Sequence, residues 1–557
     1  EELHTLLGGW GVESGDAAGS IADGYENGIL FYEHTWGGAQ WWVTKFGPAR
    51  NNIGQVSNWF YGDKWKADLK TNKYDRLLDS WEEHSDYARN VSEIASTSLQ
   101  EGMEALAISV NIEGHSMVAF NPLPWNRDAI IDGSLVKDIP AGGYKAFLPE
   151  PVSSTGALKT GNTFENDHFR IVFDPTQSAI ASLIDKHSGR ELVDSEGKHG
   201  FGQYLHEKFS ADEVAGYCDS YIRGEKNEKG WEEFYWAYAV IGKPNMPPAS
   251  EVPYRAMTAG NSTLSKSRCG NTTTFVMSAT QGETGIDYPV TTRVYLYDDA
   301  AYIDLELTID KPADIWPEAG WICLPFKVDA PQFRVGRHGF IMDPSKDIIA
   351  GANRYIYALG TGVAMFDKHG RGVGICAPET PLLSLGVTGI WKFDQTYVPE
   401  KPTAYFNLFN NQWTTNYRFW NEGKWTYRFR IWSFDKYDAA TTLITPSLEM
   451  RYPVHTSSVN TPKGKLPVQQ KGLSVSRSGV LVTAFGANPD GEGTLIRVWE
   501  QAGVSGKLTV ELPKGSEAKM ATPVNLRGET IGNTINIRND KLTFELGAFA
   551  PVSFVLE

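Results

Sequence analysis

The spacing of apolar residues divides the chain into a short helical part and a much longer β part. Between residues 55 and 108, apolar side chains recur at intervals of three, four and seven, and the segment contains no proline and only two glycines. This period is typical of one face of a long helix. Thr71 or Asn72 is a suitable cap for its start, and residues 100–109 predict a second, shorter helical piece. We therefore expect a helical hairpin or bundle.

From about residue 112 onward the pattern is that of strands and turns. Apolar and polar residues alternate over several segments that are joined by Asp-, Pro- or Gly-containing turns, notably 116–133, 168–194, 291–310 and 425–435. Together they predict one large antiparallel β region over about 160–450. A stretch rich in Pro, Gly and Ser at 457–472 indicates a linker or long loop. The short strands expected over 473–557 predict a terminal β-sandwich.

One apolar run ends in an acid and a histidine. Residues 29–38 read ILFYEHTWGG, so the run stops at Glu33 and His34. We interpret the run as a short buried strand, because it is apolar and bounded by Gly28 and by Gly37 and Gly38. In (β/α) barrels the polar residues at strand ends face the active site. Neutral imidazole is the commonest metal ligand, and neighbouring strand residues point to opposite faces, so only one of the pair would face the site. The alternative is a histidine that is hydrogen-bonded at a strand end.

Composition narrows the class of ligand. At 557 residues we expect three or four domains. A net charge of −15 without any Lys/Arg-rich run argues against a nucleic-acid partner. No stretch approaches the roughly 20 apolar residues of a membrane span. The 18 Trp, 24 Tyr and 26 Phe fit a carbohydrate-active protein, because aromatic faces stack on sugar rings, but they also fit a large β core with aromatic cross-strand pairs.

Two further segments carry candidate binding residues. Residues 407–420 combine several amides with Trp413, and an amide such as that of Asn411 can pair with two adjacent sugar hydroxyls. The alternative is an amide-rich loop that satisfies its own backbone. Arg337 and His338 lie between two glycines, in a predicted loop that could reach a ligand.

The four cysteines form no CxxC motif, which argues against a zinc knuckle or a thioredoxin-type site. Cys323 and Cys376 lie in apolar runs and are expected to pack as small hydrophobic residues. Cys218 and Cys269 could form one disulfide in an exported protein.

Six stretches, in their order along the chain, resemble segments of one enzyme family. They are EHTWGG, LLDSWEEHSDYARN, VAFNPLPWNRDAII, FENDHFRIVFDPTQSAIASLIDKHSGRELVD, AYFNLFNNQWTTNYRFWNEGKWTYRFRIW, and TLIRVWEQAGVSGKLTVELP together with ATPVNLRGE. The family is glycoside hydrolase family 38, the retaining α-mannosidases and their bacterial relatives. The resemblance implies a multidomain α+β protein with five parts: the end of a (β/α)7 barrel over 1–48, a helical bundle over 49–112, a small β linker domain over 113–160, a large antiparallel, mutarotase-like β-supersandwich over 161–456, and a C-terminal β-sandwich over 457–557.

The resemblance also implies an activity. Such a protein would be a zinc-dependent, retaining glycoside hydrolase that acts on glycans or oligosaccharides. In this interpretation His34 is a ligand of the one zinc ion. The residues expected to contact the substrate are Glu33, Trp36, Arg337, His338, Asn411 and Trp413.

The remaining zinc ligands and the catalytic nucleophile are expected ahead of residue 1. The family uses a His-x-Asp pair near its start, and the one instance in this sequence is His84-Ser85-Asp86. It falls within the long predicted helix, where residues two apart point about 200° apart around the axis. We therefore assign this pair to packing and solvent. Residue 1 is not Met and no signal peptide follows it, so we expect the sequence to continue a longer polypeptide.

Two other functions stay open at this point. A polysaccharide lyase would use Arg337, His338 and Asn411 as its centre. A non-catalytic glycan-binding subunit would bind sugar without zinc and without cleavage. Degradation of polymers favours a secreted or periplasmic protein, and self-association into a homo-oligomer is left open.

Overall fold

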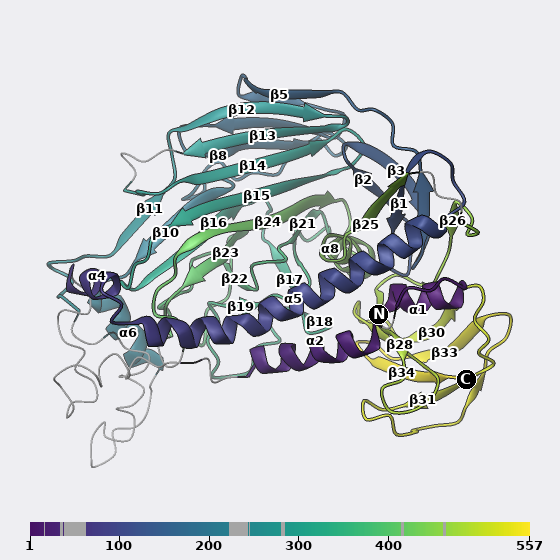
Figure 1. Cartoon of the computed structure of the whole chain (residues 1–557). Coiled ribbons are helices and arrows are strands. Elements are labelled where there is room, and N and C mark those ends of the chain that lie inside the picture. The colour runs from purple at the N-terminus through teal and green to yellow at the C-terminus, as the bar shows by residue number, and fades with distance from the viewer. Residues whose placement is uncertain are drawn as a thin grey trace, which may run out of the picture.

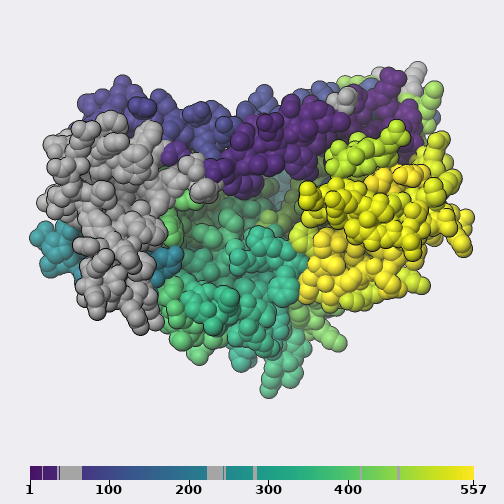
Figure 2. Space-filling model, turned by 90° about the horizontal axis from the view of Figure 1, so that it is seen from below, coloured from purple at the N-terminus to yellow at the C-terminus, as the bar shows by residue number. Residues whose placement is uncertain are grey.

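The computed structural model describes residues 1–15, 17–33, 37, 63–221, 243, 246–279, 285–413, 417–460 and 464–557. A large two-sheet β-sandwich forms the centre, a long helix runs along it, and a smaller β-sandwich lies at the C-terminal end (Figure 1). Figure 2 shows the N-terminal helices beside this C-terminal sandwich on one face of the molecule. No helix in the described part of the chain is both long and apolar enough to cross a bilayer.

The larger sheet of the central sandwich has ten antiparallel strands. In spatial order these are β18 (Phe340–Met342), β17 (Gln332–Arg337), β20 (Val363–Phe366), β21 (Gly372–Cys376), β24 (Gly423–Phe434), β15 (Tyr302–Lys311), β14 (Val290–Tyr297), β13 (Thr272–Ala279), β12 (Ser262–Cys269) and β5 (Ser154–Lys159). Along β14 buried and half-buried residues alternate, because one face of the sheet meets the core and the other meets solvent.

The facing sheet has six strands, and part of it is buried on both sides. Its spatial order is β11 (Arg255–Thr258), β10 (Gln203–Lys208), β16 (Glu318–Pro325), β23 (Thr403–Asn410), β22 (Leu382–Leu385) and β19 (Tyr357–Ala358). All eight residues of β16 are buried. Its apolar run is therefore continuous rather than alternating.

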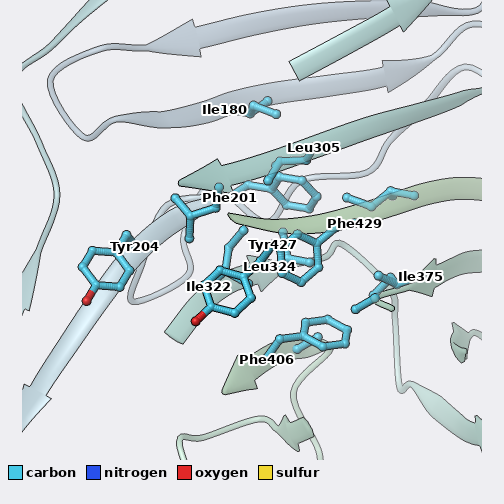
Figure 3. Packing of buried hydrophobic residues seen from close by; sticks show 14 of the residues in the cluster. Ile180, Phe201, Tyr204, Leu305, Ile322, Leu324, Ile375, Phe406, Tyr427 and Phe429 are labelled. Atoms are coloured by element: carbon cyan, nitrogen blue, oxygen red, sulfur yellow. The ribbon is translucent and has the colours of Figure 1, made fainter. Parts of the chain in front are cut away.

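The core lies between these two sheets. Phe201, Ile322 and Phe406 from one side meet Leu305 and Phe429 from the other (Figure 3). Helix α6 (Ala211–Tyr221) contributes Val214, Tyr217 and Cys218 to a second cluster, in which they pack with Trp321 of β16 and with Trp391. The predicted large antiparallel β region is thus confirmed, including the 291–310 hairpin, which is formed by β14 and β15.

The predicted meander over 168–194 is also present. It forms a four-stranded sheet with the order β6 (Thr163–Glu165), β7 (Phe169–Asp174), β8 (Ala179–Asp185) and β9 (Arg190–Glu191). Asp174 starts the first turn by accepting hydrogen bonds from the backbone N–H groups of Thr176 and Gln177.

The long helix is continuous, so the expected second helical piece does not exist as a separate element. Helix α5 (Asp75–Ser109) has 35 residues and includes 100–109, and α4 (Asp63–Lys70) precedes it. The residue before α5 is Tyr74, and its side chain makes no capping hydrogen bond. The predicted cap at Thr71 or Asn72 is therefore wrong. Gly102 is tolerated inside the helix because α1 (Glu2–Gly9) crosses there: an added Cβ would lie 2.9 Å from Leu3 Cδ2.

The apolar run at 29–32 lies at the end of a helix, and our strand prediction for it was wrong. Helix α2 (Ala18–Phe31) includes Ile29, Leu30 and Phe31. Together with Tyr32, which follows the helix, Ile21, Tyr25 and Ile29 recur every three or four residues, and this period outweighs the short run. Glycines of α2 lie against Val91 and Ile94 of α5, which brings the two helices close together.

Two smaller β units complete the fold. The sheet β25 (His455–Asn460), β1 (His115–Phe120), β4 (Tyr144–Phe147) and β26 (Gln469–Gln470) lies next to the hairpin of β2 (Arg127–Ile131) and β3 (Ser134–Ile139). Because β25 and β26 belong to it, the linker predicted at 457–472 is wrong in part. A π-helical turn, η3 (Ala439–Ile444), and helix α8 (Thr445–Arg451) precede β25.

The C-terminal sandwich agrees with its prediction. One sheet contains β27 (Ser474–Val475), β30 (Gly506–Glu511) and β33 (Lys541–Leu546). The other contains β28 (Val480–Ala487), β29 (Thr494–Glu500), β34 (Pro551–Leu556), β31 (Met520–Val524) and β32 (Ile535–Asn536). The disulfide considered for Cys218 and Cys269 is absent: both thiols are free, and Cys218 is buried whereas Cys269 is exposed.

Candidate functional site

The segment around Glu33 is held against α5. His34 and Trp36 lie outside the described residues, but Phe31 and Gly37 on either side of them are placed. The Phe31 carbonyl lies 3.0 Å from Nε2 of His84. Gly37 has φ +98 and lies so close to Ser80 that an added Cβ would be 2.9 Å from its carbonyl oxygen. His84 is buried and its ring contacts that of Phe31, as expected for a residue assigned to helix packing.

Glu33 itself is exposed and lines a cavity of about 800 Å³ between α1, α2 and α5. Most of the lining is apolar and includes Tyr25, Ile29 and Tyr32. The structure therefore places this carboxylate at the edge of an apolar groove. A contact between Glu33 and a sugar stays a prediction.

The second predicted segment, 407–420, contacts the same part of α5. Trp81 packs edge to face against Phe419 and Trp420, with ring centroids 5.2 and 5.0 Å apart. Arg418 reaches Glu82 on the same turn at 3.2 Å. Two segments that are far apart in sequence, and that we singled out independently, thus meet at residues 77–84 of α5.

Asn411 is part of this region, but its amide is occupied by the backbone. Its Nδ2 donates to the carbonyl oxygens of Trp316 (2.8 Å) and Phe419 (3.0 Å), and its Oδ1 accepts from the backbone N–H of Glu318 (2.9 Å). The side chain is buried. The prediction that Asn411 pairs directly with sugar hydroxyls is therefore not supported, and the alternative of a self-satisfied loop describes it correctly.

Trp413 has different surroundings. It is 39% exposed, and its ring lies edge-on to Tyr221 at the end of α6, with centroids 6.1 Å apart. Tyr221 in turn stacks on Tyr217. A partly exposed indole on an aromatic base can still stack on a sugar, so this role stays a prediction.

Arg337 and His338 lie in a tight hairpin and not in a loop that reaches a cleft. Arg337 pairs with Phe340, and the two turn residues between them, His338 and Gly339, both have positive φ. Gly339 leaves no room for a Cβ against Trp499 of β29. Phe340 packs on Phe549 at 4.7 Å. The hairpin therefore joins the central sandwich to the C-terminal one, and the structure does not bring Arg337 and His338 together with Asn411.

A buried charged network that the sequence analysis missed lies where β10 and β16 are paired. Glu318 is fully buried, with one carboxylate oxygen 2.9 Å from Nε2 of His206 and the other 2.6 Å from Nζ of Lys311. The Lys311 ammonium also donates to the carbonyl oxygens of Pro312 and Asn421, at 2.9 Å each. All three of its donors have partners, as a buried ammonium requires.

Two tyrosines extend this network into the core. The Tyr288 hydroxyl lies 2.9 Å from Nδ1 of His206 and 2.6 Å from the Tyr204 hydroxyl. Burial raises the pKa of both phenols above the ordinary value, so both stay protonated. Figure 3 shows Tyr204 at the margin of the apolar cluster with its hydroxyl directed away from it. We call His206, Glu318, Lys311, Tyr288 and Tyr204 the closed network.

An open cavity lies at the adjacent end of the same strands. It has a volume of about 260 Å³ and is formed by α4, the ends of β10 and β11, and the turn before β16. Its lining residues are Trp65, Lys66, Lys208, Val252, Pro253, Arg255, Asp314, Ile315 and Trp316. We call this hollow the sheet-end cavity.

Two indoles and one ion pair fix its walls. Trp316 donates from its ring N–H to the Phe209 carbonyl at 2.8 Å, and Trp65 packs edge to face on Trp420 at 5.3 Å. Lys208 and Asp314 form an ion pair at 2.6 Å. Although burial disfavours each charge, the partner raises the pKa of Lys208 and lowers that of Asp314, so the pair is charged at neutral pH.

The sequence contained a signal for both sites. The run TIDKPADIWPEAGW places Lys311, Asp314, Trp316 and Glu318 within a few residues of each other, immediately before an unbroken apolar strand. Polar residues that cluster at the start of a doubly buried strand must be paired or line an opening. This pattern would have predicted both the closed network and the sheet-end cavity from the sequence.

The described residues do not by themselves build a zinc site. Among them, no three His, Cys, Asp or Glu side chains gather in a way that could hold a metal ion. A zinc site that includes His34 would need its other ligands from outside the described residues. Zinc binding therefore stays a prediction.

Comparison with known proteins was made by sequence and by structure. No protein-family model and no curated protein matches the sequence. Among solved structures, an α-mannosidase from Enterococcus faecalis V583 superposes with a TM-score of 0.60 and 11% identity, over 88% of this chain and 63% of its own. The chain shares its fold with family 38 glycoside hydrolases. A protein of that family from Enterococcus faecalis gives the same TM-score and identity over 87% and 63% of the two chains.

The family 38 fold confirms the resemblance that the six sequence stretches indicated. Because the identity is low, the likeness concerns the architecture, a multidomain chain with few helices and many antiparallel strands. The chain spans less than two thirds of the length of these two proteins. The (β/α)7 barrel and the helical bundle stay predictions, and residues 38–62, which include the end of the predicted barrel, lie outside the described residues.

Proposed function

We propose that the protein is a glycoside hydrolase that acts on glycans or oligosaccharides, and that the sheet-end cavity belongs to its substrate-binding surface. The observation that carries the proposal is the family 38 fold, shared over most of the chain with an α-mannosidase. The cavity supports it, because an indole beside paired charged groups suits a sugar ring with its apolar faces and hydroxyls.

In this proposal the described residues bind and orient the sugar. Trp316 provides an apolar face, while Asp314 accepts hydrogen bonds from ring hydroxyls and Lys208 donates hydrogen bonds to them. The ion pair holds both groups in fixed positions before the substrate arrives, which reduces the entropy lost on binding. Trp413, which is partly exposed beside Tyr221, would provide a further aromatic surface.

The cleavage step requires more carboxylates than the described lining of the cavity provides. A retaining glycosidase needs two carboxyl groups about 5–5.5 Å apart, whereas the described lining residues include one, Asp314, which is already paired with Lys208. We therefore place the nucleophile and the acid outside the described residues, together with the zinc ligands that would accompany His34. When bound, zinc would polarise sugar hydroxyls and orient the ring.

The direct test is hydrolysis of 4-nitrophenyl α-D-mannoside and a panel of other nitrophenyl glycosides by protein that has been loaded with zinc and analysed for metal. We expect release of nitrophenol, with the α anomer formed first in an NMR time course. Trp316→Ala should raise KM at least tenfold. His338→Ala, in the hairpin on the C-terminal sandwich, serves as the matched control and should leave KM unchanged. Absence of hydrolysis across the panel by zinc-containing protein would contradict the proposal.

A second candidate is a glycan-binding protein without hydrolytic activity. The presence of one carboxylate among the described lining residues favours it, because binding needs no second one. For such a protein we expect calorimetric titration with methyl α-mannoside to show binding, and we expect no cleavage of any glycoside. The polysaccharide lyase hypothesis is not supported, since Arg337 and His338 lie in the hairpin and the Asn411 amide is hydrogen-bonded to backbone groups. Export from the cytoplasm and self-association stay predictions.

A further inference from the structure

The sheet-end cavity carries an excess of positive charge. Three of its described lining residues are basic, Lys66, Lys208 and Arg255, and one is acidic, Asp314. The acid pairs with Lys208. The side chains of Lys66 and Arg255 have no hydrogen bond or ion pair with another described residue. Among the described residues the cavity therefore presents two cations without a counter-charge, in a chain whose net charge is −15.

The strand register makes this arrangement slightly unfavourable without a ligand. Arg255 of β11 lies directly opposite Lys208 of β10 in the antiparallel pair. Side chains in such positions have Cβ atoms about 4.5–5.5 Å apart, and like charges there are destabilising. Asp314 offsets one of the two charges, and Lys66 adds another from α4. An anion in the cavity would remove the remaining repulsion.

We propose that the sheet-end cavity binds an anionic sugar, a pyranose that carries a carboxylate, sulfate or phosphate group. The inference rests on the proposed function for the carbohydrate nature of the ligand, and it adds the charge. The guanidinium of Arg255 presents a planar fork that matches carboxylate and phosphate oxygens. The indole of Trp316 supplies an apolar surface for the ring.

The size of the cavity fits one sugar unit. Cavities for drug-sized ligands span roughly 300–1,000 Å³, so a volume of about 260 Å³ suits a single residue of a glycan.

Binding measurements on the intact protein test the proposal with four probes: methyl α-D-mannoside, D-glucuronate, glucose 6-phosphate and inorganic phosphate. Isothermal titration at low and at physiological salt gives each affinity. We expect the two anionic sugars to bind at least about tenfold more tightly than the neutral one, because charge-assisted hydrogen bonds are the stronger kind. Inorganic phosphate should bind more weakly than glucose 6-phosphate, and added salt should weaken the anionic sugars most.

Matched variants locate the effect. Arg255→Gln and Lys66→Gln should each remove most of the preference for the anionic sugars. Lys70→Gln changes an exposed lysine of the same helix, α4, that does not line the cavity, and should leave the preference unchanged. Thermal unfolding of each variant checks that it is folded.

The outcomes separate this inference from the proposed function. Equal affinity for neutral and anionic sugars would overturn the charge argument, and equal affinity for inorganic phosphate and glucose 6-phosphate would show an anion site without sugar recognition. Absence of binding by all four probes would overturn the site. Hydrolysis of nitrophenyl glycosides is measured separately: activity without anionic preference refutes only the inference, whereas anionic binding without activity refutes only the hydrolase.

Discussion

Two polar clusters on the same strand differ in what surrounds their charges. His206 and Lys208 are two residues apart on β10 and therefore point to the same face. His206 belongs to the closed network, in which Glu318 and Lys311 are almost entirely removed from solvent and bonded to one another. Lys208 lines the sheet-end cavity, where Arg255 and Lys66 have no counter-charge among the described residues. A spacing of two residues along β10 therefore separates the closed network, whose charges are paired with one another, from the sheet-end cavity, where two cations have no counter-charge among the described residues.

The difference shows how a buried charge can be assigned to structure or to function. A charge whose every donor and acceptor has a protein partner has no capacity left for a ligand. A charge that faces an opening and lies near a like charge can still pair with a ligand. Without the ligand, the like charge lowers the stability of the fold somewhat. The four predictions below separate these two cases, beginning with the largest expected effect.

Replacing Glu318 by Ala should destabilise the protein most. The change would leave the Lys311 ammonium buried without its carboxylate, and removal of one partner from a buried pair costs about 3–5 kcal/mol. We expect a large fall in the midpoint of thermal and urea unfolding. Glu306→Ala is the control, because its ion pair with Arg293 is partly exposed and should contribute no more than about 1 kcal/mol. Similar losses in both variants would contradict the distinction.

Removing one hydroxyl from the closed network should have an intermediate effect. Tyr288→Phe takes away the group between Nδ1 of His206 and the Tyr204 hydroxyl. Two buried polar atoms then lose a partner, which costs about 1–3 kcal/mol. Urea denaturation measures the loss. Tyr295→Phe, on the ten-stranded sheet, serves as the control, and a loss below 0.5 kcal/mol (about the scatter of surface changes) in Tyr288→Phe would mean that the network is not coupled.

The sequence predicted the β architecture better than the site, for a physical reason. Alternation along β14 and β15 is a local signal of a sheet with one buried face, and it identified the hairpin correctly. The run at 29–32 is too short to distinguish a strand from the end of a helix. Its true state followed from contacts of α2 with Val91 and Ile94 on α5, which are more than sixty residues away.

The predicted site residues illustrate the same limit. Asn411 and His338 both looked suitable for binding, because amides and histidines beside glycines or aromatic residues occur in ligand sites. The structure uses the first to bond backbone groups of Trp316, Glu318 and Phe419, and places the second in a turn on the C-terminal sandwich. Arg255 carried no local signal, since its significance comes from the residue opposite it on β10.

The Lys208–Asp314 ion pair should give a small and pH-dependent contribution. Because the pKa of Asp314 is lowered in the folded state, the stabilisation is present above the unfolded pKa of about 3.9 and is lost as the pH falls through the lower folded value. Both side chains are partly exposed, so we expect at most about 1 kcal/mol. The difference in urea midpoint between the native protein and Asp314→Asn should be constant from pH 5 to 8 and should shrink below about pH 4. A difference that grew on acidification would have the wrong sign.

The smallest effect is expected for Arg255→Gln, and its sign is the most informative. Arg255 is exposed and has no counter-charge among the described residues, so its loss removes no stabilising contact and relieves repulsion from Lys208. We therefore expect the free variant to be as stable as the native protein or more stable by a few tenths of a kcal/mol, with a gain that disappears at high salt because screening already weakens the repulsion. Differential scanning fluorimetry at two salt concentrations measures the stability of the free variant, and the same measurement with glucose 6-phosphate gives the stabilisation by the ligand. The native protein should gain thermal stability from the sugar phosphate by mass action and the variant should not. A variant that is clearly destabilised when free would mean that Arg255 already has a partner, and the sheet-end cavity would then be a second closed network.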